Sequence, residues 1–303
     1  MSGSPLLCVA LQVALLTQRP LKFIKSGMYF WFRLLSRWPL GVLHAFGHVL
    51  GWLAWLLSPT YRRRFLDNVA QAQIPLRHAL GAVGHAGCMS TELPRLWLGA
   101  MPAVRWQGDA VVDAAYGKGQ GVIFLTPHLG CFEITAQALA QRYSPRFGAL
   151  TVLFRPARQA GLAQVMADAR GREGLETAPT TLAGVRQMIK ALRSGRAVGL
   201  LPDQVPPEGM GQWTPFFGKP AYTMTLAARL AQQTGAQIVL IWGERLPWGR
   251  GFELHAYGLD RPLSPDLEVA VLQINQAMET LVTSCPSQYL WGYARYKAPR
   301  KGL

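Results

Sequence analysis

The sequence is poor in charge, and poorest in acidic residues. Charged residues make up 16% of the 303 positions, while hydrophobic residues reach 50%. Soluble domains average about a quarter charged residues, so this balance predicts a protein associated with a membrane. Sixteen Asp and Glu against 31 Lys and Arg leave a formal net charge of +15. Such an excess predicts a polyanionic partner, which is nucleic acid, anionic lipid or an acidic protein.

The usual signatures of nucleic-acid binding are missing. The sequence contains no zinc-finger spacing, no stacking aromatics in a strand pattern and no basic recognition helix. Nucleic acid is therefore disfavoured as the partner, and anionic lipid is favoured.

Cysteine is scarce, and no two cysteines have C-x-x-C spacing. The four residues are Cys8, Cys88, Cys131 and Cys285. Scattered cysteines in apolar surroundings are typical of buried free thiols in a reducing compartment, not of a disulfide framework or a metal site. We therefore expect no metal and no cofactor.

The first 27 residues match no complete targeting signal. The apolar run from residue 6 to residue 16 is too short to span a bilayer. Its basic residues follow the apolar run, whereas those of a signal peptide precede it. We expect residues 1–27 to be a dispensable extension and Met28 to be the true start.

Residues 28–61 contain the long apolar stretch of the chain. From Trp38 to Leu57 there is no formal charge, and about 20 helical residues cross a hydrocarbon core. Arginines flank the stretch on both sides, and several tryptophans are placed as interfacial anchors. The pattern predicts a membrane-anchoring helix, although Pro39, His44 and His48 leave open a helix that lies in the interface.

Residues 62–303 have the pattern of one α/β domain. Residues 62–100 are predicted to form two or three helices, and strands then alternate with helices. This alternation predicts a mixed, largely parallel central sheet flanked by helices. Residues 209–220 are predicted to form a flexible apolar loop. The predicted strands are 121–126, 148–154, 196–201, 236–242 and 251–257, and the predicted helices are 132–142, 159–170, 182–194 and 222–234.

His128 is the leading candidate for chemistry. It follows the buried strand 121–126, in a turn that Pro127 and Gly130 define before a helix begins. Glu133, in the first turn of that helix, can reach back to one ring nitrogen and leave the other to accept a proton from a hydroxyl. The alternative is a structural histidine in a turn beside an ordinary helix residue.

Two further strands end in polar residues. Arg155 follows the strand 148–154, and Asp203 with Gln204 follows the strand 196–201. Ligands of α/β sheets bind at the carboxyl ends of strands, so these residues are candidates for substrate binding. Cys131 lies inside the His128 motif, and we interpret it as a packing residue, with a thiol nucleophile as the alternative.

Five blocks of the sequence together resemble the late acyltransferases of bacterial lipid A biosynthesis. They are His128–Glu133, Phe154–Pro156, Leu201–Gln204, Thr214–Ala221 and Gln288–Lys297. The resemblance implies a fold like that of the glycerol-phosphate acyltransferases and a catalytic domain on the cytoplasmic face of the bacterial inner membrane. It also implies acyl carrier protein thioesters as donors and a lipid A precursor as acceptor.

In that reading, His128 held by Glu133 deprotonates the acceptor hydroxyl, and no acyl-enzyme forms. Arg155 would bind a phosphate or carbonyl oxygen, and Asp203 would hold that arginine or another site group. The family commonly has His-Arg-Arg-Phe-Lys where this chain has Gly292–Lys297, so the acceptor is open. Another membrane acceptor, or a non-catalytic basic membrane-binding protein, are the alternatives.

Overall fold

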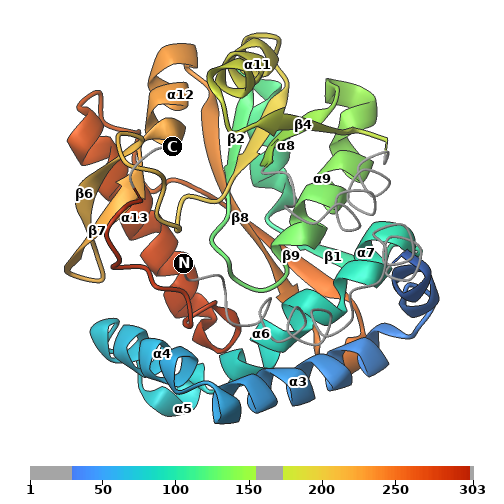
Figure 1. Ribbon diagram of the computed structural model, residues 1–303. Helices are drawn as coiled ribbons and strands as arrows, with labels where there is room; N and C mark the ends of the chain where they lie inside the picture. The colour runs from blue at the N-terminus through green and yellow to red at the C-terminus, as the bar shows by residue number, and fades with distance from the viewer. Residues whose placement is uncertain (1–28, 155–172, 301–303) are drawn as a thin grey trace, which may run out of the picture.

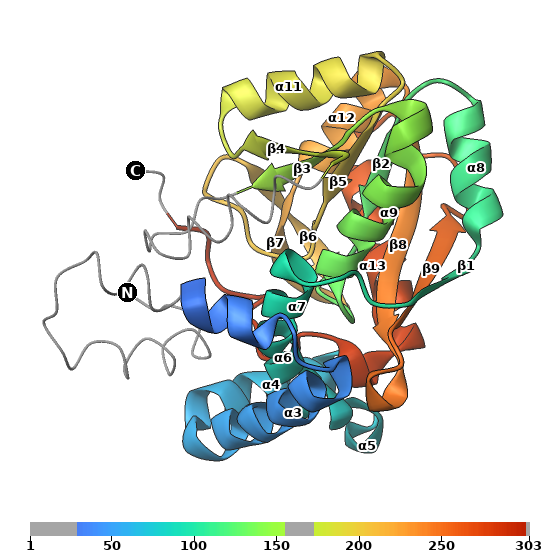
Figure 2. The same cartoon turned by 90° about the vertical axis from the view of Figure 1, so that its right-hand side faces the viewer.

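The computed structural model describes residues 29–154 and 173–300. A seven-stranded sheet lies at its centre, with helices on both faces and a separate helical layer at one end (Figures 1 and 2). The strand order is β1-β9-β8-β2-β5-β3-β4. The strands are β1 Val104–Gln107, β2 Val122–Leu125, β3 Leu150–Phe154, β4 Leu175–Pro179, β5 Ala197–Leu200, β8 Gln237–Arg245 and β9 Phe252–Gly258.

The sheet is mixed and largely parallel, as predicted. β2 pairs in parallel with both β5 and β8, and β3 pairs in parallel with β4 and β5. Only β9 runs antiparallel to its neighbour β8, while β1 is parallel to β9. The carboxyl ends of β2, β5 and β3 therefore lie along one edge of the sheet.

The uniformly apolar strand β2 is buried because both faces of the sheet are covered. Ile123 and Leu125 face one core, and Val122 and Phe124 face the other. The first core is closed by α11 Leu182–Arg193, α12 Leu226–Thr234 and α13 Leu267–Ser284. The second is closed by α7 Leu93–Leu98, α8 Asp109–Gly117 and α9 Phe132–Phe147. A strand buried on both faces is apolar throughout, as this one is.

All five predicted strands are present, with shifts of at most three residues at their ends. The predicted loop 209–220 is wrong, because most of it forms the antiparallel hairpin of β6 Gly211–Phe216 and β7 Lys219–Met224. For the same reason the helix expected from Tyr222 begins at Leu226, as α12. The edge strands β1 and β4 were not predicted, and the helix expected over 159–170 lies outside the described residues.

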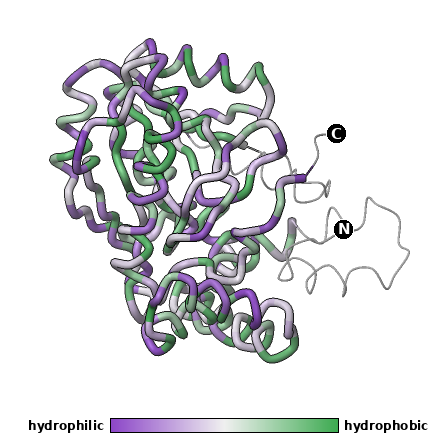
Figure 3. Tube along the Cα trace, turned by 90° about the vertical axis from the view of Figure 1, so that its left-hand side faces the viewer, coloured by the Kyte–Doolittle hydropathy of each residue, from purple (hydrophilic) through white to green (hydrophobic). Residues whose placement is uncertain are grey.

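The helical layer consists of α3 Leu40–Leu57, α4 Pro59–Gln71, α5 Leu76–Ala79 and α6 Gly81–Thr91. With α7, residues 62–100 thus contain more than the two or three helices expected. Figure 3 shows apolar segments both in the central strands and in this layer.

Helices α3 and α6 pack with their backbones in close contact. A methyl group added to Gly47 would lie 2.7 Å from the backbone nitrogen of Cys88, and one added to Gly51 would meet the carbonyl oxygen of Val83. Gly87 faces the carbonyl oxygen of Gly47 in the same way. Small residues at both sides of a helix pair permit this approach, and larger ones would force the helices apart.

The other side of α3 is apolar and exposed. Phe46, Val49, Leu53 and Leu56 recur at helical spacing, and between 45% and 65% of each side chain is accessible. Among the described helices, α3 is the one long and apolar enough to cross a membrane, and 28% of its apolar window is buried inside the protein. The helix therefore presents one face to the protein and an apolar face to its surroundings.

Candidate active site

His128 lies in a tight turn after β2. Gly130 has a φ of 57° and forms a bridge with Gly243 of β8, where a side chain would collide with the Gly243 carbonyl oxygen. This left-handed conformation is one that glycine adopts without strain. The carbonyl oxygen of His128 accepts a hydrogen bond from the backbone nitrogen of Leu290 at 3.1 Å. The turn is therefore held on two sides by backbone.

Asp203 reaches His128 because β2 and β5 are parallel neighbours in register. Leu125 stands opposite Leu200, so three residues further along each chain the two side chains meet. Nδ1 of His128 lies 2.7 Å from Oδ1 of Asp203, and the backbone nitrogen of His128 donates to Oδ2 at 2.8 Å. The carboxylate thus holds both the ring and the backbone of the histidine.

Asp203 is buried, with 2% of its surface exposed. Burial would raise its pKa, but the charge of His128, the two hydrogen bonds from that residue and the charge of Arg295 hold the pKa below its ordinary value. Arg295 is itself buried, where it donates to the backbone of Tyr222 and to Thr223. Asp203 is therefore ionised at neutral pH.

These contacts select one tautomer of His128. Because an ionised carboxylate only accepts hydrogen bonds, Nδ1 carries the proton and Nε2 carries the lone pair. Gln204 agrees with this, since its side-chain nitrogen lies 3.0 Å from Nε2 and can donate to it. The structure thus brings together three residues that the sequence singled out, with the basic nitrogen of His128 facing Gln204.

Glu133 is in the first turn of α9, as expected. Its Oε2 accepts a hydrogen bond of 3.1 Å from the indole nitrogen of Trp97. The sequence interpretation placed Glu133 at one ring nitrogen of His128, and in the structure Asp203 contacts Nδ1. A catalytic role of Glu133 stays a prediction.

Cys131 is 1% exposed and belongs to the second core. Burial raises the pKa of its thiol well above the ordinary value. A reactive cysteine is accessible and ionised, so the surroundings of Cys131 favour the packing role.

Arg155 lies outside the described residues, directly after β3. Since β3 is parallel to β5, its carboxyl end opens on the same edge of the sheet as His128 and Asp203.

Several site residues were not singled out from the sequence. Trp97 holds Glu133, and Arg295 acts electrostatically on Asp203. Tyr293 accepts a hydrogen bond of 3.0 Å from the backbone of Val205, next to Gln204. Arg295 and Tyr293 belong to the closing block 288–297, whose dense aromatic and basic residues were the available signal.

Lys297, the last residue of this block, is influenced by two further basic side chains. The ammonium group of Lys297 sits 4.7 Å from the ring centre of Tyr293. Burial, and then the charges of Arg300 and Arg64, hold the pKa of Lys297 below its ordinary value. The charges of Arg300 and Arg64 thus reach Lys297, and a concentration of positive charge attracts anions.

A histidine of fixed tautomer thus lies beside a buried carboxylate at a strand end of an α/β protein, an arrangement suited to general-base chemistry. Residues 97–298 match the family described as bacterial lipid A biosynthesis acyltransferase. This match covers more than half of the chain and includes His128, Glu133, Asp203 and Gln204. The protein belongs to that family.

Three relatives are named as acyltransferases, two of them of lipid A biosynthesis. The chain is 30% identical over 121 residues to the lipid A biosynthesis lauroyltransferase of Escherichia coli (strain K12), covering 39% of this chain and 40% of that protein. It is 23% identical over 197 residues to lipid A biosynthesis acyltransferase 2 of Shigella flexneri, covering 62% and 59%. It is also 29% identical over 144 residues to the phosphatidylinositol mannoside acyltransferase of Mycobacterium tuberculosis (strain CDC 1551 / Oshkosh), covering 46% and 44%. The matches thus span from two fifths to three fifths of the relatives' lengths.

Proposed function

We propose that this protein transfers a fatty acyl chain from an acyl carrier protein thioester to a hydroxyl of a lipid A precursor of the Kdo-lipid IVA type. Membership of the family supports the reaction class. The observation that carries the chemistry is the 2.7 Å contact between Nδ1 of His128 and Asp203, which leaves the lone pair on Nε2. A base held in this way at a strand end is suited to activate a hydroxyl.

The reaction is a direct transfer. The acceptor hydroxyl takes the place of Gln204 at Nε2 of His128 and gives its proton to that nitrogen. The alkoxide oxygen attacks the thioester carbonyl carbon and forms a tetrahedral oxyanion. The carbon–sulfur bond then breaks, and the proton passes from the imidazolium to the leaving thiolate. Ester and thiol are the products, and no covalent acyl-enzyme is needed.

Each site residue has a proposed part in this scheme. Asp203 orients His128 and stabilises the imidazolium, since its carboxylate stays ionised in the buried site. Glu133, held by Trp97 at the start of α9, is proposed to act together with His128 as a His-x4-Glu dyad. Arg155 is proposed to bind a phosphate or carbonyl oxygen, and Gln204 the acceptor.

The charge distribution supports anionic substrates. The net charge of +15 suits both a phosphorylated glycolipid and an acidic carrier protein. The charges of Arg64 and Arg300 act on Lys297, so the three side chains form one basic group. We propose that this basic group receives a phosphate of the acceptor.

We propose that the protein acts at the cytoplasmic face of the bacterial inner membrane, with α3 lying in the interface. A spanning α3 would take α6 into the hydrocarbon as well, because the two helices pack backbone to backbone. It would also bury the ion pair of Glu92 and Arg245 within the bilayer. An interfacial helix avoids this and still buries the apolar face of α3 in lipid.

A second acceptor class has specific support. The mycobacterial relative is named for a phosphatidylinositol mannoside, a glycolipid other than lipid A. Its 29% identity over 144 residues is close to the 30% over 121 residues of the lauroyltransferase. A glycolipid of another kind is therefore the alternative acceptor.

The test is a transfer assay with purified protein and radiolabelled acyl carrier protein thioester. Lipid IVA carrying Kdo, phosphatidylinositol mannoside and lysophospholipid are offered separately, and the products are analysed by mass spectrometry. We expect an ester on the first acceptor, and none when His128 is changed to Ala. Transfer only to another glycolipid would replace the proposed acceptor, and no transfer to any of them would contradict the proposed reaction.

A further inference from the structure

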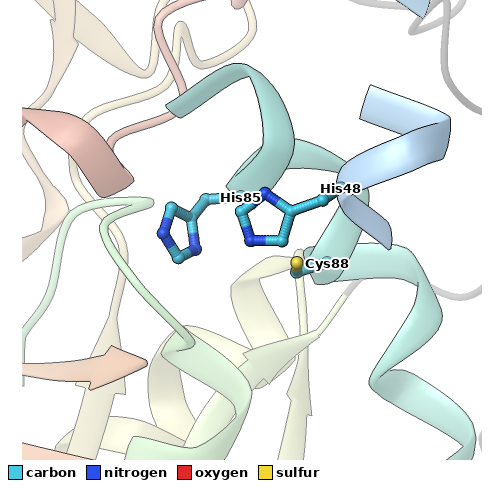
Figure 4. Close-up of side chains that lie close together, drawn as sticks. All are labelled: His48, His85 and Cys88. Atoms are coloured by element: carbon cyan, nitrogen blue, oxygen red, sulfur yellow. The ribbon is translucent and has the colours of Figure 1, made fainter. Parts of the chain in front are cut away.

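A cluster of three metal-ligand side chains lies between α3 and α6. His48 comes from α3, and His85 and Cys88 come from α6, three residues apart and thus on one face of that helix. One donor atom from each side chain lies within 4.8 Å of the other two (Figure 4). The rings of His48 and His85 are 4.9 Å apart between centres. The close contact of the two helices thus brings residues far apart in sequence into one small volume.

Two buried polar atoms here have no hydrogen-bond partner among the described residues. They are Nδ1 of His85 and Nη1 of Arg245. The charge of Arg245 acts on both His85 and Cys88, so all three belong to one electrostatic environment. Buried polar atoms normally have a partner, and each exception calls for an explanation.

The donor set is chemically selective. Two imidazoles and one thiolate are ligands that zinc and similar divalent ions take up in tetrahedral sites. Burial, followed by the charge of Arg245, lowers the pKa of His85 to about 3. Its ring is therefore neutral at physiological pH, which is the form that binds a metal.

The charges nearby suit a metal-bound thiolate. Burial raises the pKa of Cys88 to about 12, so the free residue is a thiol. Binding of a divalent ion would form a metal–sulfur bond and release the thiol proton to solvent. The charge of Arg245, whose Nη1 has no hydrogen-bond partner among the described residues, would then stabilise the negatively charged sulfur. The charge of Arg245 is balanced by Glu92, which accepts from its side chain at 2.9 and 2.6 Å.

We propose that His48, His85 and Cys88 form a binding site for a zinc-class divalent ion, which joins α3 to α6. The protein supplies three ligands, and the partly exposed His48 leaves room for water as the fourth. With ligands from both helices, the ion would fasten the apolar α3 to the rest of the protein. Its role is structural, since the acyl transfer proposed above uses His128.

The experiment uses the full chain purified in detergent. Zinc content is measured by elemental analysis, the metal is removed with a chelator, and Co²⁺ is titrated in as a spectroscopic probe. We expect one ion per chain, a sulfur-to-cobalt charge-transfer band and the intense visible bands of a tetrahedral site. Cys88→Ser should abolish the charge-transfer band, and His85→Gln and His48→Gln should each weaken binding more than about tenfold.

Matched controls come from the same chain. Cys285→Ser removes another free thiol, and His78→Gln removes an exposed histidine, and neither should change the cobalt spectrum. If Cys88→Ser does not fold, the wild-type protein decides, because Zn²⁺ should raise its thermal unfolding midpoint.

Absence of both zinc and the cobalt band in wild type would overturn the proposal, as would a charge-transfer band that survives Cys88→Ser. In either case a buried water at the unpartnered Nδ1 of His85 would be the better account. The spectra do not depend on acyl transfer, so this result is separate from the test of the proposed function.

Discussion

The substitution Asp203→Asn is the sharpest test of the site, because it removes the carboxylate charge and keeps the shape of the side chain. Asp203 accepts two hydrogen bonds from His128, one from the ring and one from the backbone. An asparagine has only one accepting oxygen, so it can satisfy one of these donors and not both. If the backbone keeps the oxygen, the amide nitrogen faces Nδ1 and drives the ring proton to Nε2. His128 then lacks a lone pair where the acceptor hydroxyl must bind.

The expected loss of transfer rate follows from the proposed role of His128 as a general base. A misdirected general base forfeits about 10² to 10⁴ in rate, which is about 3 to 5 kcal/mol of transition-state stabilisation. His128→Ala should lose as much, and the double variant His128→Ala/Asp203→Asn little more, since residues that act as a unit are not additive. Glu133→Gln is the matched comparison, because it removes the other nearby carboxylate charge.

The assay is the initial rate of acyl transfer from the carrier protein thioester, measured with the thermal unfolding midpoint of each variant. Asp203→Asn that keeps most of its activity while Glu133→Gln loses it would refute the assignment of the orienting role to Asp203. Losses of similar size in both would place both carboxylates in the mechanism. A variant that unfolds at the assay temperature is compared with the wild-type protein at a lower temperature.

Other expectations can be checked with the same protein. Deletion of residues 1–27 should leave the transfer rate unchanged, and loss of complementation by a protein that still accumulates in membranes would contradict this. Cys131→Ala should keep most activity, whereas a folded but inactive Cys131→Ala, together with an acyl thioester found on Cys131 of the wild-type protein, would overturn the direct mechanism. Phe46→Asp should weaken liposome binding, most clearly at high salt, where attraction to anionic lipid is screened. Burial would raise the pKa of Glu92, but the charge of Arg245 brings it to about 2, below the ordinary 4.5. This carboxylate therefore contributes stability that is present above about pH 4.5 and is lost as the pH falls toward 2. Glu92→Gln should cost about 3 to 5 kcal/mol at neutral pH and flatten that acid slope in thermal unfolding.

The sequence predicted most of the central fold because buried parallel strands have a strong local signal. β2 is apolar at every position and is followed by glycine and proline punctuation, so its place was clear. β6 was missed because its glycine and proline obscure the alternation of polar and apolar residues that marks a strand. Its buried and exposed positions alternate only over part of its length. The edge strand β4 has one fully buried residue, so its sequence shows little of the apolar pattern by which a strand is predicted.

The site residues were likewise predicted only where the signal is local in the sequence. His128 was identified from its local motif, and Glu133 was chosen as its partner because it is near in sequence. Asp203 is 75 residues away, and only the parallel register of β2 and β5 brings it to Nδ1. His48 and His85 likewise meet through helix packing, which residue spacing does not encode.

The glycine contacts between α3 and α6 have a consequence for which substrates the protein accepts. Because the backbones of α3 and α6 touch, no layer of flexible side chains separates the two helices at these glycines, and α3 cannot easily tilt or slide on α6. Glu92, which follows α6, is joined by an ion pair to Arg245 at the end of β8, and β8 is hydrogen-bonded to β2. In the proposed orientation, with α3 lying in the interface, His128 would stand at a constant height above the lipid surface. We therefore expect the protein to select acceptor lipids by the height of their hydroxyl groups. An acceptor should react when its headgroup raises a hydroxyl to the height of His128, whatever the rest of its structure.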